Sequence, residues 1–391
     1  MIGGQLMATV SLRMRDRKKG RVYELVINRV IGGIRKREYR ALPAGTTKAL
    51  AQKIANQVQM EIELGEYVEK NSITFREYAD TYLELYCKNL SPSTFHSYVG
   101  MLNSVTGINS WFGDVPIQKI DNESIQRYVN YISEDCKKTP KTCRNVVNLM
   151  HLILRKAVIQ KYIRSNPAEN IEMPRRKRPA THAYSLEEVS VLLERSKDDV
   201  ALQTIIGLGC LAGLRRSEMC ALKISNIILS DEKNEIQIKE NIVKFDKVVY
   251  TREGKTHNSI RDIPIPETLV DILKRAITDY KVRKLKYGEA FKDTDGQLLA
   301  YEDGSFRDPQ GIYKAYNKFI QKQEDLPHYT LHQLRHTYAS IMVNLGVNPK
   351  IIQENLGHAD LTTTLNVYTH TYSKTKQMEA KRLDEALKMA K

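Results

Sequence analysis

Apolar and polar positions change their spacing several times along this chain, and each spacing predicts a different kind of element. Between residues 9 and 43 they alternate, which is typical of strands with one buried face. The alternating runs and the turns between them lie at 10–15, 16–20, 23–30, 32–33 and 34–42. From 47 to 64 apolar residues recur every three or four positions, which predicts a helix. Residues 1–70 are therefore expected to form a three-stranded sheet with one helix.

Helical spacing dominates the next hundred residues. The predicted helices lie at 75–88, 93–104, 123–134 and 141–162. Two of them follow Ser91-Pro92 and Thr139-Pro140, which are helix start signals. We expect Trp111 to pack in the core of this segment; the alternative is a base-stacking residue. The pattern predicts an all-α domain at 71–172, followed by a linker at 173–184 that carries the run Met-Pro-Arg-Arg-Lys-Arg-Pro.

The pattern becomes mixed in the remaining residues, 185–391. Ser185 and Glu188 form a capping box, and Gly357 suits a helix end. The predicted helices lie at 201–214, 267–285, 308–323, 331–345, 349–356 and 373–391, and the predicted strands at 235–243, 248–251 and 260–265. The last helix has an apolar edge that needs a surface to dock against. The fold class is therefore multidomain and mainly α with small β-sheets, ending in a mixed α/β domain.

The net charge of the chain indicates what kind of molecule it binds. The chain has 391 residues and carries 61 Lys and Arg against 46 Asp and Glu, a formal net charge of +15. Such an excess favours a polyanion, most simply nucleic acid, although a basic protein without such a partner is the alternative. The five cysteines form no C-x-x-C pair, and no apolar run is long enough to span a membrane. We expect a cytoplasmic protein without structural metal.

Basic residues gather at three places that could contact DNA. A solvated charged face without a partner is the alternative for each. The candidates are Arg13, Arg15, Arg17, Lys18, Lys19, Arg35 and Arg37 in the sheet, Lys141 and Arg144 at the start of a helix, and Arg175, Arg176, Lys177 and Arg178 in the linker.

Two short motifs suit the binding of a phosphate. His332 and Arg335 are three residues apart, so they share one face in the first turns of a helix whose N-cap is Thr330. A helix N-terminus and a guanidinium fork both favour an anion there. Arg215 directly follows an apolar run, and Glu218 lies three residues later. A chance His-x-x-Arg and a structural Arg–Glu pair are the alternatives.

Four boxes together resemble the tyrosine recombinases, also called the phage integrase family. They are Ala-Gly-Leu-Arg-Arg-Ser-Glu-Met at 212–219, His-Gln-Leu-Arg at 332–335, Leu-Gly-His at 356–358 and Val-Tyr-Thr-His at 367–370. The resemblance implies that the catalytic residues are Arg215, Lys255, His332, Arg335, His358 and Tyr368. It makes Glu218 a supporting residue. Lys247 is the competitor of Lys255, and Tyr372 is the alternative nucleophile.

The resemblance also implies a function. It predicts a site-specific DNA recombinase, the integrase of a mobile element, that works through a 3′-phosphotyrosine without metal, ATP or other cofactor. The first domain would bind arm-type DNA sites and the second core-type sites. A homotetramer on DNA, an excision factor and a host DNA-bending protein are the expected partners, with the terminal helix docked in cis or on a neighbour. A topoisomerase of type IB and a non-enzymatic architectural DNA-binding protein are the alternatives.

Overall fold

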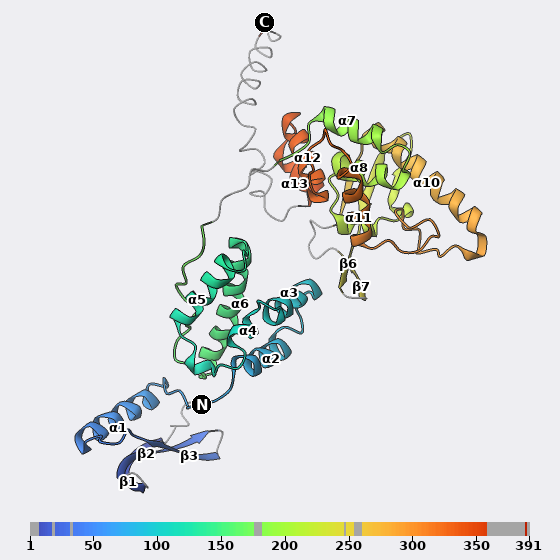
Figure 1. The fold of residues 1–391 in the computed structure, drawn as a ribbon. Coiled ribbons are helices and arrows are strands. Elements are labelled where there is room, and N and C mark those ends of the chain that lie inside the picture. The colour runs from blue at the N-terminus through green and yellow to red at the C-terminus, as the bar shows by residue number, and fades with distance from the viewer. Residues whose placement is uncertain are drawn as a thin grey trace. The chain divides into compact units, whose positions relative to one another are not determined.

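The computed structural model describes residues 8–17, 20–31, 34–175, 182–245, 248–253, 260–357 and Lys388. The chain forms two compact units, residues 1–177 and 178–391 (Figure 1).

The first unit opens with the predicted sheet and helix. Strands β1 (Thr9–Arg17), β2 (Gly20–Ile31) and β3 (Ile34–Ala41) pair antiparallel in chain order, and α1 (Lys48–Glu63) packs against one face. Leu25 and Ile27 on the central strand are buried against Ala51, Ala55 and Val58 of the helix. The alternation that predicted the strands therefore also selected the face that the helix covers.

The rest of the first unit is helical, as predicted. It contains α2 (Phe75–Tyr86), α3 (Pro92–Asn103), α4 (Ile108–Phe112), α5 (Asn122–Glu134) and α6 (Pro140–Ile159) around a core of its own. The placement of Trp111 in this core was wrong in part. Its side chain is 40% exposed, and its ring packs at the edge of the core on Tyr128 and Tyr131. Position 112 of the same short helix supplies the fully buried ring, that of Phe112.

The second unit combines helices with small antiparallel sheets. The helices are α7 (Leu186–Arg195), α8 (Val200–Ala212), α9 (Arg216–Ala221), α10 (Glu267–Tyr287), α11 (Pro309–Ile320), α12 (Leu331–Asn344) and α13 (Pro349–Leu356). Helix α8 is almost wholly buried and packs against α7, α10, α11 and α12. An apolar helix without a polar face is suited to this central place.

One predicted strand of the second unit is two strands in the structure. The expected strand 235–243 divides at Lys239 into β5 (Asn234–Ile238) and β6 (Glu240–Phe245). Strand β5 lies between β4 (Ile227–Leu229) and β8 (Arg261–Pro264), whereas β6 forms a separate hairpin with β7 (Val248–Glu253). Alternation identifies strands but not their partners, because pairing depends on contacts distant in sequence.

The predicted terminal helix 373–391 lies outside the described residues, apart from Lys388, which is helical. Within the described part of the chain, no helix is both long and apolar enough to cross a membrane.

Candidate active site

The site begins where the central helix α8 ends. Gly213 terminates this helix in the left-handed conformation, with φ of +66°, as glycine does at helix C-termini. A Cβ on Gly213 would lie 2.6 Å from Tyr338 Cδ1 and 2.8 Å from Leu356 Cδ2, so only glycine fits there. The turn brings Arg215 to the N-cap of α9, where its backbone N–H donates to Glu218 Oε2 at 2.8 Å.

Helix α12 brings the second motif to the same place. Thr330 precedes the helix, as predicted, and its backbone N–H donates to Gln333 Oε1 at 2.7 Å. The His332 side chain is exposed at the surface and its ring packs against that of His336, whereas Arg335 is only 4% exposed. Arg335 Nη1 donates to the carbonyl oxygen of Gly213 at 2.8 Å, so the two motifs are in direct contact.

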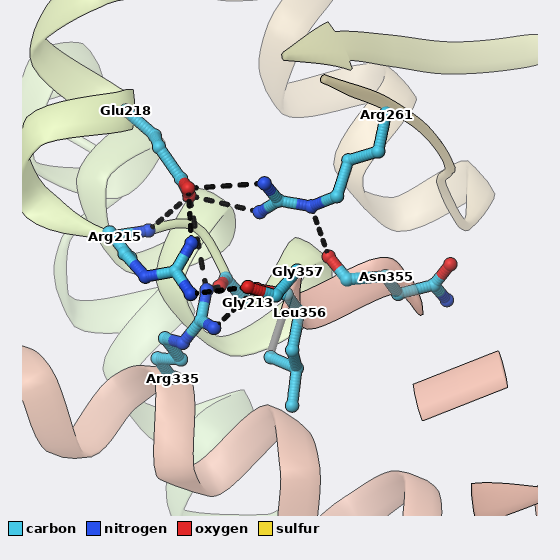
Figure 2. Close-up of polar contacts among 8 residues, drawn as sticks. All are labelled: Gly213, Arg215, Glu218, Arg261, Arg335, Asn355, Leu356 and Gly357. Atoms are coloured by element: carbon cyan, nitrogen blue, oxygen red, sulfur yellow. Dashed lines mark hydrogen bonds and ion pairs between the residues drawn. The ribbon is translucent and has the colours of Figure 1, made fainter. Parts of the chain in front are cut away.

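Glu218 lies at the centre of a cluster of three arginines (Figure 2). Its carboxylate accepts from Arg215 Nη1 at 2.6 Å and from both terminal nitrogens of Arg261 at 3.1 and 3.0 Å. Arg335 Nη1 lies 3.8 Å from Glu218 Oε2. One buried carboxylate thus faces three guanidinium groups, which leaves a formal charge of +2 on the cluster.

The C-terminal end of α13 lies on the same arginines. Arg261 Nε donates to the carbonyl oxygen of Asn355 at 2.7 Å, Arg335 Nη2 to that of Leu356, and Arg215 Nη2 to that of Gly357 at 2.8 Å (Figure 2). The last carbonyls of a helix have no partner within it and carry its negative dipole end. Three consecutive carbonyls therefore dock onto three guanidinium groups, immediately before residue 358.

Burial and neighbouring charges shift the pKa values of the ionisable groups at the site. Burial alone would raise the pKa of Glu218, but Arg261, Arg215 and Arg335 outweigh it and lower that pKa to about 2. Burial and the neighbouring Arg215 lower the pKa of Arg335 to about 9, so it stays charged at neutral pH. Partial desolvation and the charges of Arg335 and Arg215 hold the pKa of His332 below its ordinary value, so its imidazole is neutral at pH 7.

A cavity of about 750 Å³ opens beside these groups. Arg215, Arg216, Lys244 and His332 are among the residues that line it, and Lys244 Nζ lies 2.6 Å from Asp308 Oδ2. Within the described residues, no group of three or more His, Cys, Asp and Glu side chains could hold a metal ion.

The structure brings together four of the predicted site residues and adds a fifth. Arg215, Glu218, His332 and Arg335 are adjacent, as described above. The other predicted site residues and their competitors lie outside the described residues; these are Lys247, Lys255, His358, Tyr368 and Tyr372.

The fifth residue, Arg261, belongs to none of the sequence motifs and was not among the predicted site residues. Its side chain is only 7% exposed, and its Nε donates to the Asn355 carbonyl. The sequence contained an indication of this burial. Successive residues of a strand point to opposite faces, so on β8 Arg261 lies on the same face as the buried Ile263, and Asp262 lies on the other. An arginine on a buried strand face needs a carboxylate partner.

The predicted DNA-binding residues of the sheet share one face. The strand register places Arg13 opposite Glu24 and Tyr39 opposite Val26, so the arginines at 13, 15, 35 and 37 project from the face away from α1. Arg13 Nη2 lies 2.6 Å from Glu24 Oε2, and its guanidinium lies over the Tyr39 ring. Arg37 Nε donates to Asn28 Oδ1 at 2.7 Å.

The remaining basic candidates are less completely described. Lys141 and Arg144 are exposed in the first turns of α6, and Arg175 is exposed. Arg17 ends β1, but its side chain is not among those described. The other candidates lie outside the described residues; these are Lys18, Lys19, Arg176, Lys177 and Arg178.

Comparison with known families covers most of the chain. The Phage integrase family matches residues 184–375, and the Phage integrase SAM-like domain matches residues 74–173. Among curated proteins, a tyrosine recombinase XerC-like protein of Caldanaerobacter subterraneus is 29% identical over 359 residues, which is 87% of this chain and 90% of the relative. The ICEBs1 integrase of Bacillus subtilis is 25% identical over 358 residues, which is 89% of this chain and 93% of the relative.

Solved structures have the same fold. The Tn1549 transposon integrase in complex with transposon right end DNA aligns with a TM-score of 0.63 at 23% identity, over 80% of this chain and 99% of that one. A lambda integrase dimer bound to a core site aligns with a TM-score of 0.56 at 15% identity, over 90% of this chain and 93% of that one. The chain therefore belongs to the phage integrase family, the tyrosine recombinases, whose members cleave and rejoin DNA strands through a tyrosine intermediate.

Proposed function

We propose that this protein is the integrase of a mobile genetic element, which integrates and excises that element by site-specific strand exchange. One observation carries the assignment to this chain's own residues. Arg215 and Arg335, which come from different sequence boxes, converge on Glu218, and His332 lines the cavity beside them.

The charge of the cluster suits a phosphodiester. A phosphodiester carries one negative charge, and attack by a tyrosinate adds a second in the transition state. The formal charge of +2 on the three arginines and Glu218 matches the transition state better than the ground state, which is the condition for rate acceleration. Arg215 and Arg335 now donate to the carbonyls of Gly357 and Leu356. The proposal requires that phosphate oxygens replace these acceptors when DNA binds.

The other predicted catalytic residues would attack the phosphorus, transfer protons or bind the phosphate. The Tyr368 hydroxyl would attack the scissile phosphorus, and His332, neutral at pH 7, would accept its proton. The bond from phosphorus to the 5′ oxygen breaks, and Lys255 would protonate that oxygen as it leaves. His358 would donate a hydrogen bond to the phosphate. The products are a 3′-phosphotyrosine and a free 5′-hydroxyl.

Strand exchange reverses this step with a new partner. The 5′-hydroxyl of a second duplex would attack the phosphotyrosine, releasing Tyr368 and forming a Holliday junction. Because the covalent bond conserves the energy of the phosphodiester, no ATP is needed. A lambda integrase of the same fold has been solved as a tetramer bound to a Holliday junction, and we propose a tetramer on DNA here as well.

Both parts of the first unit would hold DNA. The arginine face of the sheet would bind arm-type sites, with Arg13, Arg15, Arg35 and Arg37 against the duplex. Lys141 and Arg144 at α6, together with the linker from Arg175 to Arg178, would follow the phosphates of the core-type site. An excision factor and a host DNA-bending protein complete the proposed assembly, which would act at the bacterial nucleoid. The reported relatives give no support to the topoisomerase or architectural alternatives.

Covalent trapping tests the proposed function. The probe is a nicked duplex built from the DNA that flanks the gene, whose short cleaved end diffuses away and leaves the protein attached. We expect a denaturant-resistant adduct with the wild-type chain and with Tyr372→Phe, and none with Tyr368→Phe. An adduct that survives in Tyr368→Phe and disappears in Tyr372→Phe would move the nucleophile. Tight binding without any wild-type adduct would contradict the recombinase mechanism.

A further inference from the structure

Arg261 connects two parts of the site that the catalytic arginines also touch. From strand β8 it reaches both oxygens of Glu218 on α9, and its Nε donates to the Asn355 carbonyl of α13 at 2.7 Å (Figure 2). Its side chain is 7% exposed and does not line the cavity. We therefore expect Arg261 to act on the reaction through the groups that it holds.

The first of these groups is the Glu218 carboxylate. Arg261 approaches it with two nitrogens at 3.1 and 3.0 Å, and Arg335 lies further away, at 3.8 Å. A bidentate pair of this kind is the strongest arrangement between a guanidinium and a carboxylate. Without Arg261, the whole charge of Glu218 would act on Arg215 and Arg335. Their attraction for a phosphate would then be smaller.

The second group is the C-terminal end of α13. Three arginines hold three consecutive carbonyls there, but only Arg261 has no proposed contact with DNA. When phosphate oxygens replace the carbonyls of Leu356 and Gly357, the Asn355 carbonyl keeps its donor. The helix end then stays in place while the two catalytic arginines change partners.

We propose that Arg261 is a positioning residue for strand cleavage: it occupies Glu218 and anchors the end of α13, so that Arg215 and Arg335 remain available to the scissile phosphate. The inference rests on the proposed roles of those two arginines. It predicts that Arg261 affects the rate of the covalent step at saturating DNA, and has little effect on DNA affinity.

A pH effect follows from the same geometry. The charged groups that face Glu218 are Arg215 beside α9, Arg261 on β8 and Arg335 on α12, and Arg261 opposes most strongly the rise that burial alone would cause in the pKa of Glu218. Removal of Arg261 should therefore raise the pKa of this carboxyl, so that it takes up a proton at a higher pH. The rate of Arg261→Gln should therefore depend on pH on the acidic side in a way that the wild type, whose Glu218 stays ionised there, does not share.

The chain offers a matched control in Arg283. This side chain is also largely buried, at 14% exposure, and it joins a carboxylate to the backbone: its Nε donates to Asp279 Oδ2 at 2.8 Å and its Nη1 to the Tyr301 carbonyl at 2.6 Å. Neither partner belongs to the site. The test compares Arg261→Gln and Arg261→Lys with Arg283→Gln and Arg283→Lys, all in the full chain.

The measurements are the rate of adduct formation on the nicked duplex at saturating concentration from pH 5.5 to 9, the DNA affinity and the thermal stability. We expect Arg261→Gln to form adduct about 10- to 100-fold more slowly than the wild type, as is usual when a supporting partner of a reactive group is lost. Arg261→Lys should have an intermediate rate, because one ammonium cannot replace both the fork and the Nε donor. The Arg283 variants should form adduct at the wild-type rate, with an unmoved pH profile.

Equal rates and equal pH profiles for Arg261→Gln and Arg283→Gln would overturn the inference. If Arg261→Gln does not fold, the two lysine variants decide, and a wild-type rate for Arg261→Lys would overturn it. Absence of an adduct from the wild type contradicts the proposed function instead, so the two failures are distinguishable.

Discussion

Replacement of Glu218 by glutamine should destabilise the second unit by an amount that depends on pH. The substitution keeps the shape of the side chain but removes the one negative charge that faces Arg215, Arg261 and Arg335. Three buried or partly buried guanidinium groups would then lie together without a carboxylate. Removal of one partner from a buried ion pair is strongly destabilising, by roughly 3–5 kcal/mol.

The pKa of Glu218 gives an independent value for the contribution of its charge to the free energy of unfolding. In the folded protein it is about 2, against 4.5 for the ordinary carboxyl. At about 1.4 kcal/mol per pKa unit, the ionised carboxylate stabilises the fold by about 3.5 kcal/mol at pH 7. Because the folded-state pKa is the lower one, this stabilisation is present above pH 4.5 and is lost as the pH falls towards 2. At pH 3 about 1.5 kcal/mol should remain.

The two units can be followed separately in the full chain. The chain has one tryptophan, Trp111, which lies in the first unit, so its fluorescence reports urea unfolding of that unit alone. Far-ultraviolet circular dichroism reports both units. For Glu218→Gln we expect the circular dichroism transition to move to lower urea at pH 7, the Trp111 transition to stay where it is, and the difference from wild type to narrow at pH 3. An unmoved transition at pH 7, or an equal difference at both pH values, would refute this reasoning.

Two further pairs of substitutions, each a test variant with its control, examine other parts of the structure. Gly213→Ala should lower the free energy of unfolding by about 2–4 kcal/mol in urea titrations, because it combines a left-handed backbone with a Cβ that overlaps Tyr338. Gly296→Ala, at φ of +70° with open space around it, should lower it by only about 1 kcal/mol, and an equal effect would contradict the packing argument. Arg37→Gln should reduce by about 1 the slope of log affinity for arm-type DNA against log salt. Lys53→Gln on the exposed side of α1 should leave that slope unchanged, and equal slopes for the two variants would exclude the sheet face as the contact.

Local patterns predicted most elements because the causes of those elements are local. Helix starts such as Thr139-Pro140 and the glycine ends at Gly213 and Gly357 lie where the sequence indicated, since caps depend on a few neighbouring residues. The pairing of β5 with β8 was not predictable in this way. The intervening hairpin interrupts the run, and nothing in an alternating pattern identifies a partner beyond it.

The site itself was predicted through its motifs, and its support was not. The spacing of His332 and Arg335 on one helix is a local property, and the structure keeps it. The contact of Arg261 with Glu218 joins residues 43 positions apart, and it depends on how β8 lies against α9. A buried arginine is informative in the sequence only when the buried face of its strand is already known. For that reason the charge balance of the cluster could be derived only from the structure.

The site is assembled from helix ends, whose carbonyl oxygens accept hydrogen bonds from the arginines. Arg335 donates to two of them, the Gly213 carbonyl after α8 and the Leu356 carbonyl of α13. The first is fixed, because α8 is buried on all sides and Gly213 is enclosed by Tyr338 and Leu356. The second belongs to α13, whose Ile352 and Leu356 side chains are buried in an apolar cluster with Tyr338. Because packing holds the Leu356 side chain in place, we expect a bound phosphate to displace only its carbonyl oxygen from Arg335 Nη2. Arg335 Nη1 should keep the Gly213 carbonyl, so the guanidinium should keep its orientation while its outer donor changes partner.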